Sequence, residues 1–146
     1  MGNVKIKCEI EVDRQRIADV VCSGFEGGIG YWATITGYVP PPKDADLYVG
    51  REDDRERGLF KHIDYPMCEE GGGVVLGDAE NDGKGFDLTA NGGGRVTLTY
   101  AGIVKGLGLM ATKYPRHFSN LVADGGDAET GDVLIQLAVF GDIVYG

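Results

Sequence analysis

A helix that ends in a cluster of glycines most constrains how this chain folds. In Asp13–Trp32 (DRQRIADVVCSGFEGGIGYW), apolar residues recur at the three-to-four-residue spacing of an amphipathic helix, and Asp13 is suited to the N-cap. We expect the helix to end at GGIG, because glycine readily adopts the positive φ angles of a C-terminal cap. Tyr31 and Trp32 follow directly. The segment therefore predicts a helix–turn–strand joint that brings two aromatic rings beside a pocket.

Alternation and β-branched residues predict the strands. Residues Lys5–Val12 place Ile6, Cys8, Ile10 and Val12 on one face, which is typical of a half-buried strand. A second strand is predicted at Trp32–Tyr38, because β-branched and aromatic residues dominate there and three prolines follow. Shorter strands are predicted at Leu59–Ile63, Val74–Leu76 and Arg95–Leu98.

The last third of the chain predicts three helices. Thr99 is suited to cap the first, Pro115 begins the second at Pro115–Ala123, and the third spans about Gly131–Phe140 behind an acidic start. At 146 residues we expect a single domain over 1–146. The fold class predicted is α+β, an antiparallel sheet with an N-terminal helix and a C-terminal group of helices packed on one face.

Charge and composition argue against several classes of binding partner and of stabilising site. The net charge of −9, with 14 scattered basic residues, disfavours binding to long nucleic acid. No apolar run reaches the roughly 20 residues of a membrane span, and Met1–Val12 lacks the pattern of a signal peptide, so we expect a cytoplasmic protein that binds no membrane. Three cysteines without a C-x-x-C pair disfavour a disulfide framework and a zinc site.

Catalytic and metal-binding patterns are weak. The run that begins at Asp78 resembles the start of a calcium loop, but Thr89 stands where the bidentate glutamate belongs. The glycine clusters lack phosphate-loop spacing, and neither His62 nor His117 lies in a catalytic motif. We therefore predict no catalytic residue, no metal and no cofactor, and a protein that is not an enzyme.

The best binding signal is the stretch KYPRHF, which contains Arg116 and His117 at a helix start beside two aromatic residues. A helix N-terminus with an arginine binds phosphate, and an aromatic ring can stack on a base. The alternative is that Arg116 pairs with an acid such as Asp124 while the rings fill the core. Arg57 is a further candidate anion contact, and the turn-rich stretch around Phe86 is a hairpin or a ligand-facing loop.

Three motifs carry a resemblance to a known family: IADVVCSGFEGGIGYW, LMATKYPRHFSNLVAD and DAETGDVLIQLAVFGDIVYG. Together they resemble a family of small proteins encoded by phages and prophages, and the chain is similar to the phage Thoeris anti-defence sponge proteins. The motifs cover roughly half of the chain, at both ends, whereas Pro40–Gly94 matches poorly.

The resemblance implies a non-enzymatic homo-oligomer in the host cell cytosol. Such a protein captures a cyclic nucleotide immune signal, such as a cyclic ADP-ribose isomer or a cyclic oligonucleotide, without cleaving it. Alternatives are an acidic protein-binding inhibitor of a host defence complex and a small phosphoesterase-like hydrolase. The residues proposed to contact the ligand are Arg116, Arg57, Phe86, Asn91, Trp32 and His117.

Overall fold

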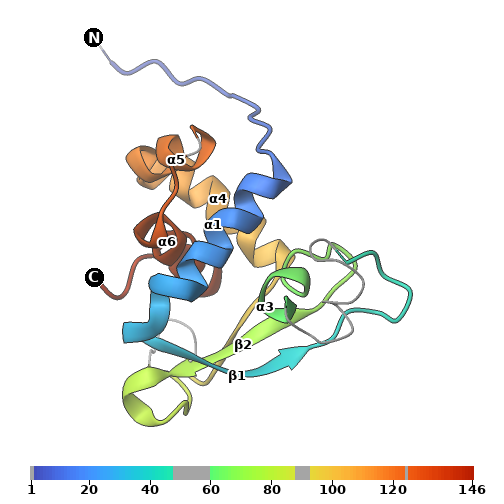
Figure 1. Ribbon diagram of the computed structural model, residues 1–146. Coiled ribbons are helices and arrows are strands. Elements are labelled where there is room, and N and C mark those ends of the chain that lie inside the picture. The colour runs from blue at the N-terminus through green and yellow to red at the C-terminus, as the bar shows by residue number, and fades with distance from the viewer. Residues whose placement is uncertain (1, 48–59, 88–92, 124) are drawn as a thin grey trace.

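The computed structural model describes residues 2–47, 60–87, 93–123 and 125–146, and it confirms the predicted α+β class (Figure 1). An N-terminal helix and a C-terminal group of helices pack together above a three-stranded antiparallel sheet. The elements in chain order are α1 (Arg14–Gly27), η1 (Ile29–Tyr31), β1 (Ala33–Val39), α3 (Lys61–Asp64), β2 (Gly73–Asp78), η2 (Ala79–Asn81), β3 (Val96–Leu98), α4 (Tyr100–Lys113), α5 (Pro115–Val122) and α6 (Ala128–Phe140).

Helix α1 begins where the sequence predicts it. The Asp13 carboxylate accepts a hydrogen bond from the Gln15 N–H at 2.7 Å, which caps the first turn. The helix ends at the predicted glycines, but Gly28 has a φ of −107° rather than a positive angle, so that detail was wrong. Glycine is needed here because the backbone passes close to the start of α6: a Cβ atom on Gly28 would lie 2.4 Å from the Ala128 carbonyl oxygen.

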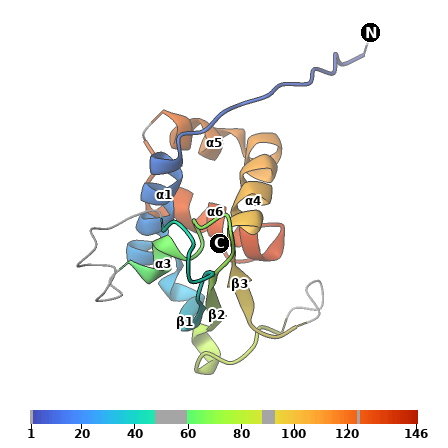
Figure 2. The same ribbon diagram turned by 90° about the vertical axis from the view of Figure 1, so that its right-hand side faces the viewer.

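Glycines allow α6 to lie close to two neighbouring helices. Helix α6 packs against both α1 and α4, as Figure 2 shows. At the α1 crossing, a Cβ atom on Gly131 would lie 2.4 Å from the Val20 carbonyl oxygen. At the α4 crossing, a Cβ atom on Gly106 would lie 3.0 Å from the Ala138 nitrogen. The helical core is therefore built by backbone approach as well as by apolar side chains.

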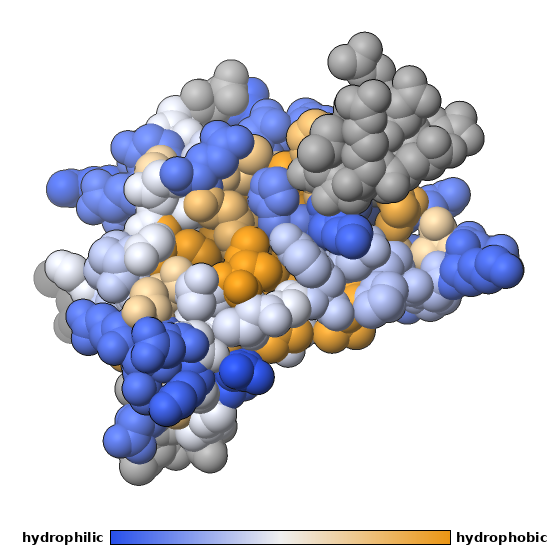
Figure 3. Space-filling view, turned by 60° about the horizontal axis from the view of Figure 1, so that its bottom comes forward, coloured by the Kyte–Doolittle hydropathy of each residue, from blue (hydrophilic) through white to orange (hydrophobic). Residues whose placement is uncertain are grey.

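The sheet has the strand order β1-β2-β3, and both pairings are antiparallel. Strand β2 lies in the middle, with Val74 and Leu76 fully buried. Strand β1 is an edge strand with a register shift between Ile35 and Gly37, and most of its side chains are exposed. Figure 3 views the molecule from the side of the sheet and shows hydrophobic surface among hydrophilic side chains. The helices thus cover the sheet on one side only, as predicted.

Two predicted strands are wrong. Residues 2–12 form no strand, because alternation creates an apolar face but does not supply a neighbouring strand to pair with. At Leu59–Ile63 the described residues instead enter the short helix α3, whose first turn is closed by Ile63 and Asp64 N–H groups donating to the Phe60 carbonyl oxygen. Four residues are too few for helical periodicity to show in the sequence.

The predicted C-terminal helices are confirmed, and each has the expected start. The Thr99 hydroxyl accepts a hydrogen bond from the Gly102 N–H, and the Asp127 carboxylate accepts one from the Thr130 N–H. Pro115 occupies the first turn of α5. None of the helices in the described part of the chain has the length and apolar character that crossing a bilayer requires.

The glycine contact between α1 and α6 yields a stability prediction. Replacement Gly131→Ala forces a methyl group against the α1 backbone, so we expect the free energy of unfolding to fall by about 1–3 kcal/mol. Gly108→Ala is the matched control on α4, because nothing lies within 4 Å of the added Cβ atom. Alanine has a higher helix propensity than glycine, so this variant should gain up to about 1 kcal/mol in the free energy of unfolding. Urea denaturation followed by circular dichroism measures both, and equal stability of the two variants would contradict the close packing.

Candidate functional site

A cavity of about 520 Å³ opens among η1, α5, α6 and the C-terminal tail. Its walls combine aromatic rings, carboxylates, an amide and an imidazole, which makes it more polar than the cavity between α1 and α4. We call it the α5/α6 cavity. It is lined by Tyr31, His117, Glu129, Asp132, Val133, Gln136, Ile143, Tyr145 and Gly146.

The buried carboxylate of Asp132 forms the inner wall. Its Oδ1 atom accepts hydrogen bonds from Trp32 Nε1 at 2.7 Å and from Gln136 Nε2 at 2.9 Å, and its Oδ2 atom accepts one from the Tyr31 hydroxyl at 2.7 Å. No arginine or lysine among the described residues pairs with it. Three neutral donors therefore replace the water that Asp132 loses on burial.

Gln136 connects this carboxylate to the end of the chain. Its amide oxygen accepts hydrogen bonds from the N–H groups of Val144 and Tyr145, each at 2.8 Å. Its amide nitrogen donates to Asp132 and to the Tyr145 carbonyl oxygen. All hydrogen-bonding capacity of this buried side chain is used. The amide thereby fixes the tail that forms one side of the cavity.

Behind the cavity lies a cluster of aromatic rings. Tyr145 stacks on Trp32 with ring centroids 5.3 Å apart and an interplanar angle of 7°. Phe140 and Phe86 contact the same indole at 5.3 and 5.9 Å. These distances suit the offset and edge contacts that aromatic rings prefer. The cluster fixes the orientation of the Trp32 indole and hence of its N–H donor.

Tyr31 stands at the edge of the cavity, with about half of its surface exposed. Burial of the hydroxyl, followed by its hydrogen bond to Asp132 and the negative charge there, raises the pKa of Tyr31 to about 12. The hydroxyl therefore keeps its proton at physiological pH and remains a donor. The exposed ring is free to contact a ligand.

The outer wall contains His117 and Glu129. The His117 Nδ1 atom lies 3.4 Å from the Thr130 hydroxyl oxygen, and Thr130 is fully buried. Glu129 occupies the first turn of α6, and its exposed carboxylate makes no hydrogen bond or ion pair with the described residues. The outer wall thus offers a ligand one imidazole and one unpaired carboxylate.

The residues predicted to contact a ligand are only partly brought together. Trp32 and Phe86 contact each other, but both are buried in the core and neither lines the α5/α6 cavity. His117 lines the α5/α6 cavity, and Arg116 is the exposed residue before it on α5, without an ion pair to a described residue. Arg57 and Asn91 lie outside the described residues, as does Asp124, the acid suggested as a partner of Arg116.

Sequence reasoning missed the residues at the centre of the site. Gln136 is the polar residue within the otherwise apolar stretch VLIQLAVF, and Asp132 lies directly before this stretch, four residues before Gln136. Such a pair on a buried helix indicates a hydrogen-bond network, since buried polar groups need partners. Adjacent Tyr31 and Trp32 offer matching donors. The pairing itself was hidden, because Trp32 and Asp132 are 100 residues apart.

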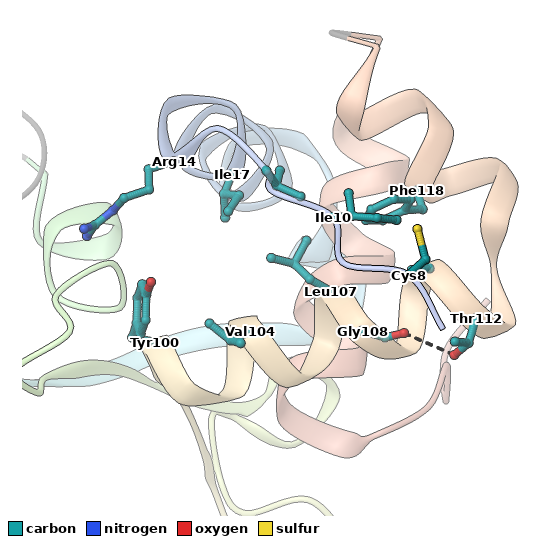
Figure 4. A pocket seen from close by; sticks show the side chains of 12 residues that line it. Cys8, Ile10, Arg14, Ile17, Tyr100, Val104, Leu107, Gly108, Thr112 and Phe118 are labelled. Atoms are coloured by element: carbon teal, nitrogen blue, oxygen red, sulfur yellow. Dashed lines mark hydrogen bonds between the residues drawn. The ribbon is translucent and has the colours of Figure 1, made fainter. Parts of the chain in front are cut away.

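A second cavity of about 540 Å³ lies between α1 and α4, and we call it the α1/α4 cavity (Figure 4). Apolar side chains form most of it, including Ile17, Val104 and Leu107. At one end stands Arg14, whose guanidinium donates to Glu69 and to the Met67 carbonyl oxygen. This cavity suits apolar groups. Across the described ranges, no three His, Cys, Asp or Glu side chains are grouped to hold a metal ion.

The Asp132 network yields a second prediction. Trp32→Phe keeps a ring but removes a donor from a buried carboxylate, so we expect the free energy of unfolding to fall by about 2 kcal/mol. Tyr31→Phe removes a different donor from the same carboxylate at the exposed edge, where water can replace it, and should cost less than about 1 kcal/mol. Chemical denaturation measures both; a Tyr31→Phe loss equal to or larger than the Trp32→Phe loss would refute this order.

Comparisons with models of protein families, with curated proteins and with solved structures each found no match to this chain. The resemblance to phage-encoded proteins therefore stays a prediction. Function has to be argued from the residues of the site.

Proposed function

We propose that this protein is a non-enzymatic phage counter-defence protein that binds a cyclic nucleotide signal in the α5/α6 cavity and holds it intact. The observation that carries the proposal is the grouping of Tyr31, His117 and Glu129 around one cavity of about 520 Å³. An aromatic ring, an imidazole and a carboxylate match the base, phosphate and sugar of a nucleotide. The volume lies within the usual range for small-molecule sites.

The sugar and the base are assigned to different walls. Carboxylates commonly accept hydrogen bonds from ribose hydroxyls. Glu129 is the suitable carboxylate, because Asp132 already accepts three hydrogen bonds within the protein. The exposed Tyr31 ring offers a surface on which a base can stack.

The phosphates belong at the mouth of the cavity. Asp132 repels a phosphate from the inner part, since its negative charge has no arginine or lysine beside it in the described structure. Arg116 and His117 lie in the first turn of α5, where backbone N–H groups also favour an anion. We therefore propose the phosphate-binding role for Arg116, the exposed neighbour of His117 on α5.

Binding without cleavage agrees with the surroundings of His117. A hydrolase would need a nucleophile or water that the imidazole can activate at the bound phosphate. The hydroxyl that lies beside the imidazole belongs to Thr130, which is fully buried and beyond the reach of a ligand. Sequestration requires only tight, reversible contacts. We further propose that the protein acts in the host cytosol as a homo-oligomer.

A panel of cyclic nucleotides tests this function. At a concentration of 100 times Kd, a ligand adds about 2.7 kcal/mol of stability, which predicts a rise in Tm of roughly 5–10 °C. Heating should then release the nucleotide unchanged, as chromatography can verify. Glu129→Gln and His117→Ala should each weaken binding about tenfold or more. Asp44→Asn, which neutralises an exposed carboxylate away from the cavity lining, should leave binding unchanged.

The other outcomes separate the alternatives. Recovery of an altered nucleotide would overturn sequestration in favour of hydrolysis. Absence of stabilisation by every cyclic nucleotide, together with a stable complex with a host protein, would favour the acidic protein-binding inhibitor. The net charge of −9 is the observation that supports this second function. Equal binding by wild type and the Glu129 and His117 variants would remove the α5/α6 cavity as the site.

A further inference from the structure

The N-terminal end of segment 2–12 extends away from the body of the molecule, as Figures 1 and 2 show. Its N–H and C=O groups make no backbone hydrogen bonds with the described residues. Val4 and Ile6 are 88% and 83% exposed, although the alternation of apolar residues in this segment is that of a half-buried strand. The segment therefore has the sequence of a strand but lacks a paired neighbour, and the outer half of its apolar face is uncovered.

The charges of this segment are complementary to themselves. Read outward from Cys8 in VKIKCEIEV, each lysine on one side matches a glutamate at the same distance on the other side. The apolar residues match as well, since Ile6 is equivalent to Ile10 and Val4 to Val12. A two-fold axis through Cys8 would thus bring opposite charges together along the whole segment.

We propose that two copies of this chain dimerise by pairing these segments as antiparallel strands, with Cys8 opposite the partner's Cys8. Lys7 then faces Glu9 of the partner subunit, and Lys5 faces Glu11 of the partner subunit. Directly opposed side chains in an antiparallel pair lie on the same face and interact. On one face of the ribbon each lysine therefore pairs with a glutamate of the other strand, and the other face is entirely apolar.

Other pairings are less favourable. Parallel strands in register would oppose Lys5 with Lys5 and Glu9 with Glu9, which places like charges together. Moving the antiparallel register by two residues places either Lys7 opposite the partner's Lys7 or Glu9 opposite the partner's Glu9. Moving it by one residue puts apolar side chains on the charged face. Only the register centred on Cys8 pairs all the charges and keeps both faces uniform.

The apolar face of the ribbon matches the α1/α4 cavity. Cys8, Ile10 and Val12 of the segment already line this cavity, as Figure 4 shows for Cys8 and Ile10. In the proposed register the partner's Ile6 lies beside Ile10, and the partner's Val4 lies beside Val12. These two exposed side chains would therefore come over the same apolar cavity.

Covering the cavity gives the ribbon the support it needs. A two-stranded ribbon alone is marginally stable in water. Nine residues span about 30 Å, which is long enough for each half of the ribbon to lie on a different subunit. Val104 on α4, half of whose surface is exposed, lines the same cavity and would be covered by the ribbon. Dimerisation does not require a nucleotide, so this proposal and the proposed nucleotide binding can fail separately.

Charge exchange tests the register. Lys5→Glu/Lys7→Glu makes all four charged positions acidic, and Glu9→Lys/Glu11→Lys makes all four basic. Sedimentation velocity should show a dimer for the wild-type chain and a dissociation constant raised about tenfold or more for each double variant. An equimolar mixture of the two double variants should restore the dimer, because acidic strands then face basic ones.

Lys43→Glu/Lys105→Glu is the matched control, since it changes the net charge equally at two exposed lysines outside the segment. It should dimerise like the wild type. All substituted side chains are exposed, and circular dichroism verifies that each variant is folded. A monomeric wild-type chain, unaffected dimerisation in the double variants, or a mixture that stays monomeric would each overturn the proposal.

Discussion

The burial of one carboxylate organises this structure. Taking an ionised aspartate out of water costs several kcal/mol unless hydrogen bonds replace its hydration. Asp132 receives three such bonds: an indole and a phenol donate from the adjacent Trp32 and Tyr31 after α1, and an amide donates from Gln136, one turn further along α6. The joint after α1, helix α6 and the C-terminal tail must therefore assemble together. Losing one of the three donors leaves the buried carboxylate with fewer hydrogen bonds than its burial requires.

The same network shapes the proposed ligand cavity. Gln136 binds both the carboxylate and the tail, so the position of Tyr145 follows from that of Asp132. Tyr145 in turn stacks on Trp32, which holds the indole that donates to the carboxylate. This closed set of contacts leaves Tyr31 at the edge with its ring exposed. Trp32 thus supports the cavity from behind, although we predicted from the sequence that it contacts the ligand.

Signals that act over a few residues predicted most of the fold. Capping by Asp13 and Thr99 and the proline at the start of α5 concern contacts within one turn, so the sequence displays them directly. The site depends on contacts between distant residues. An aromatic residue can serve equally in a core or in a pocket, and Phe86 and Trp32 proved to be buried. Arg57 and Asn91 lie outside the described residues and stay predictions.

The N-terminal segment shows how a local pattern can be informative and still give the wrong element. Alternation states which face of a strand is apolar, but the hydrogen-bonding partner must come from elsewhere. In the single chain neither edge strand, β1 or β3, pairs with this segment. Its lysines and glutamates are nevertheless ordered so that the best complement of the segment is its own reverse. The fold of one chain leaves this pattern unused, and the dimer that we propose would use it.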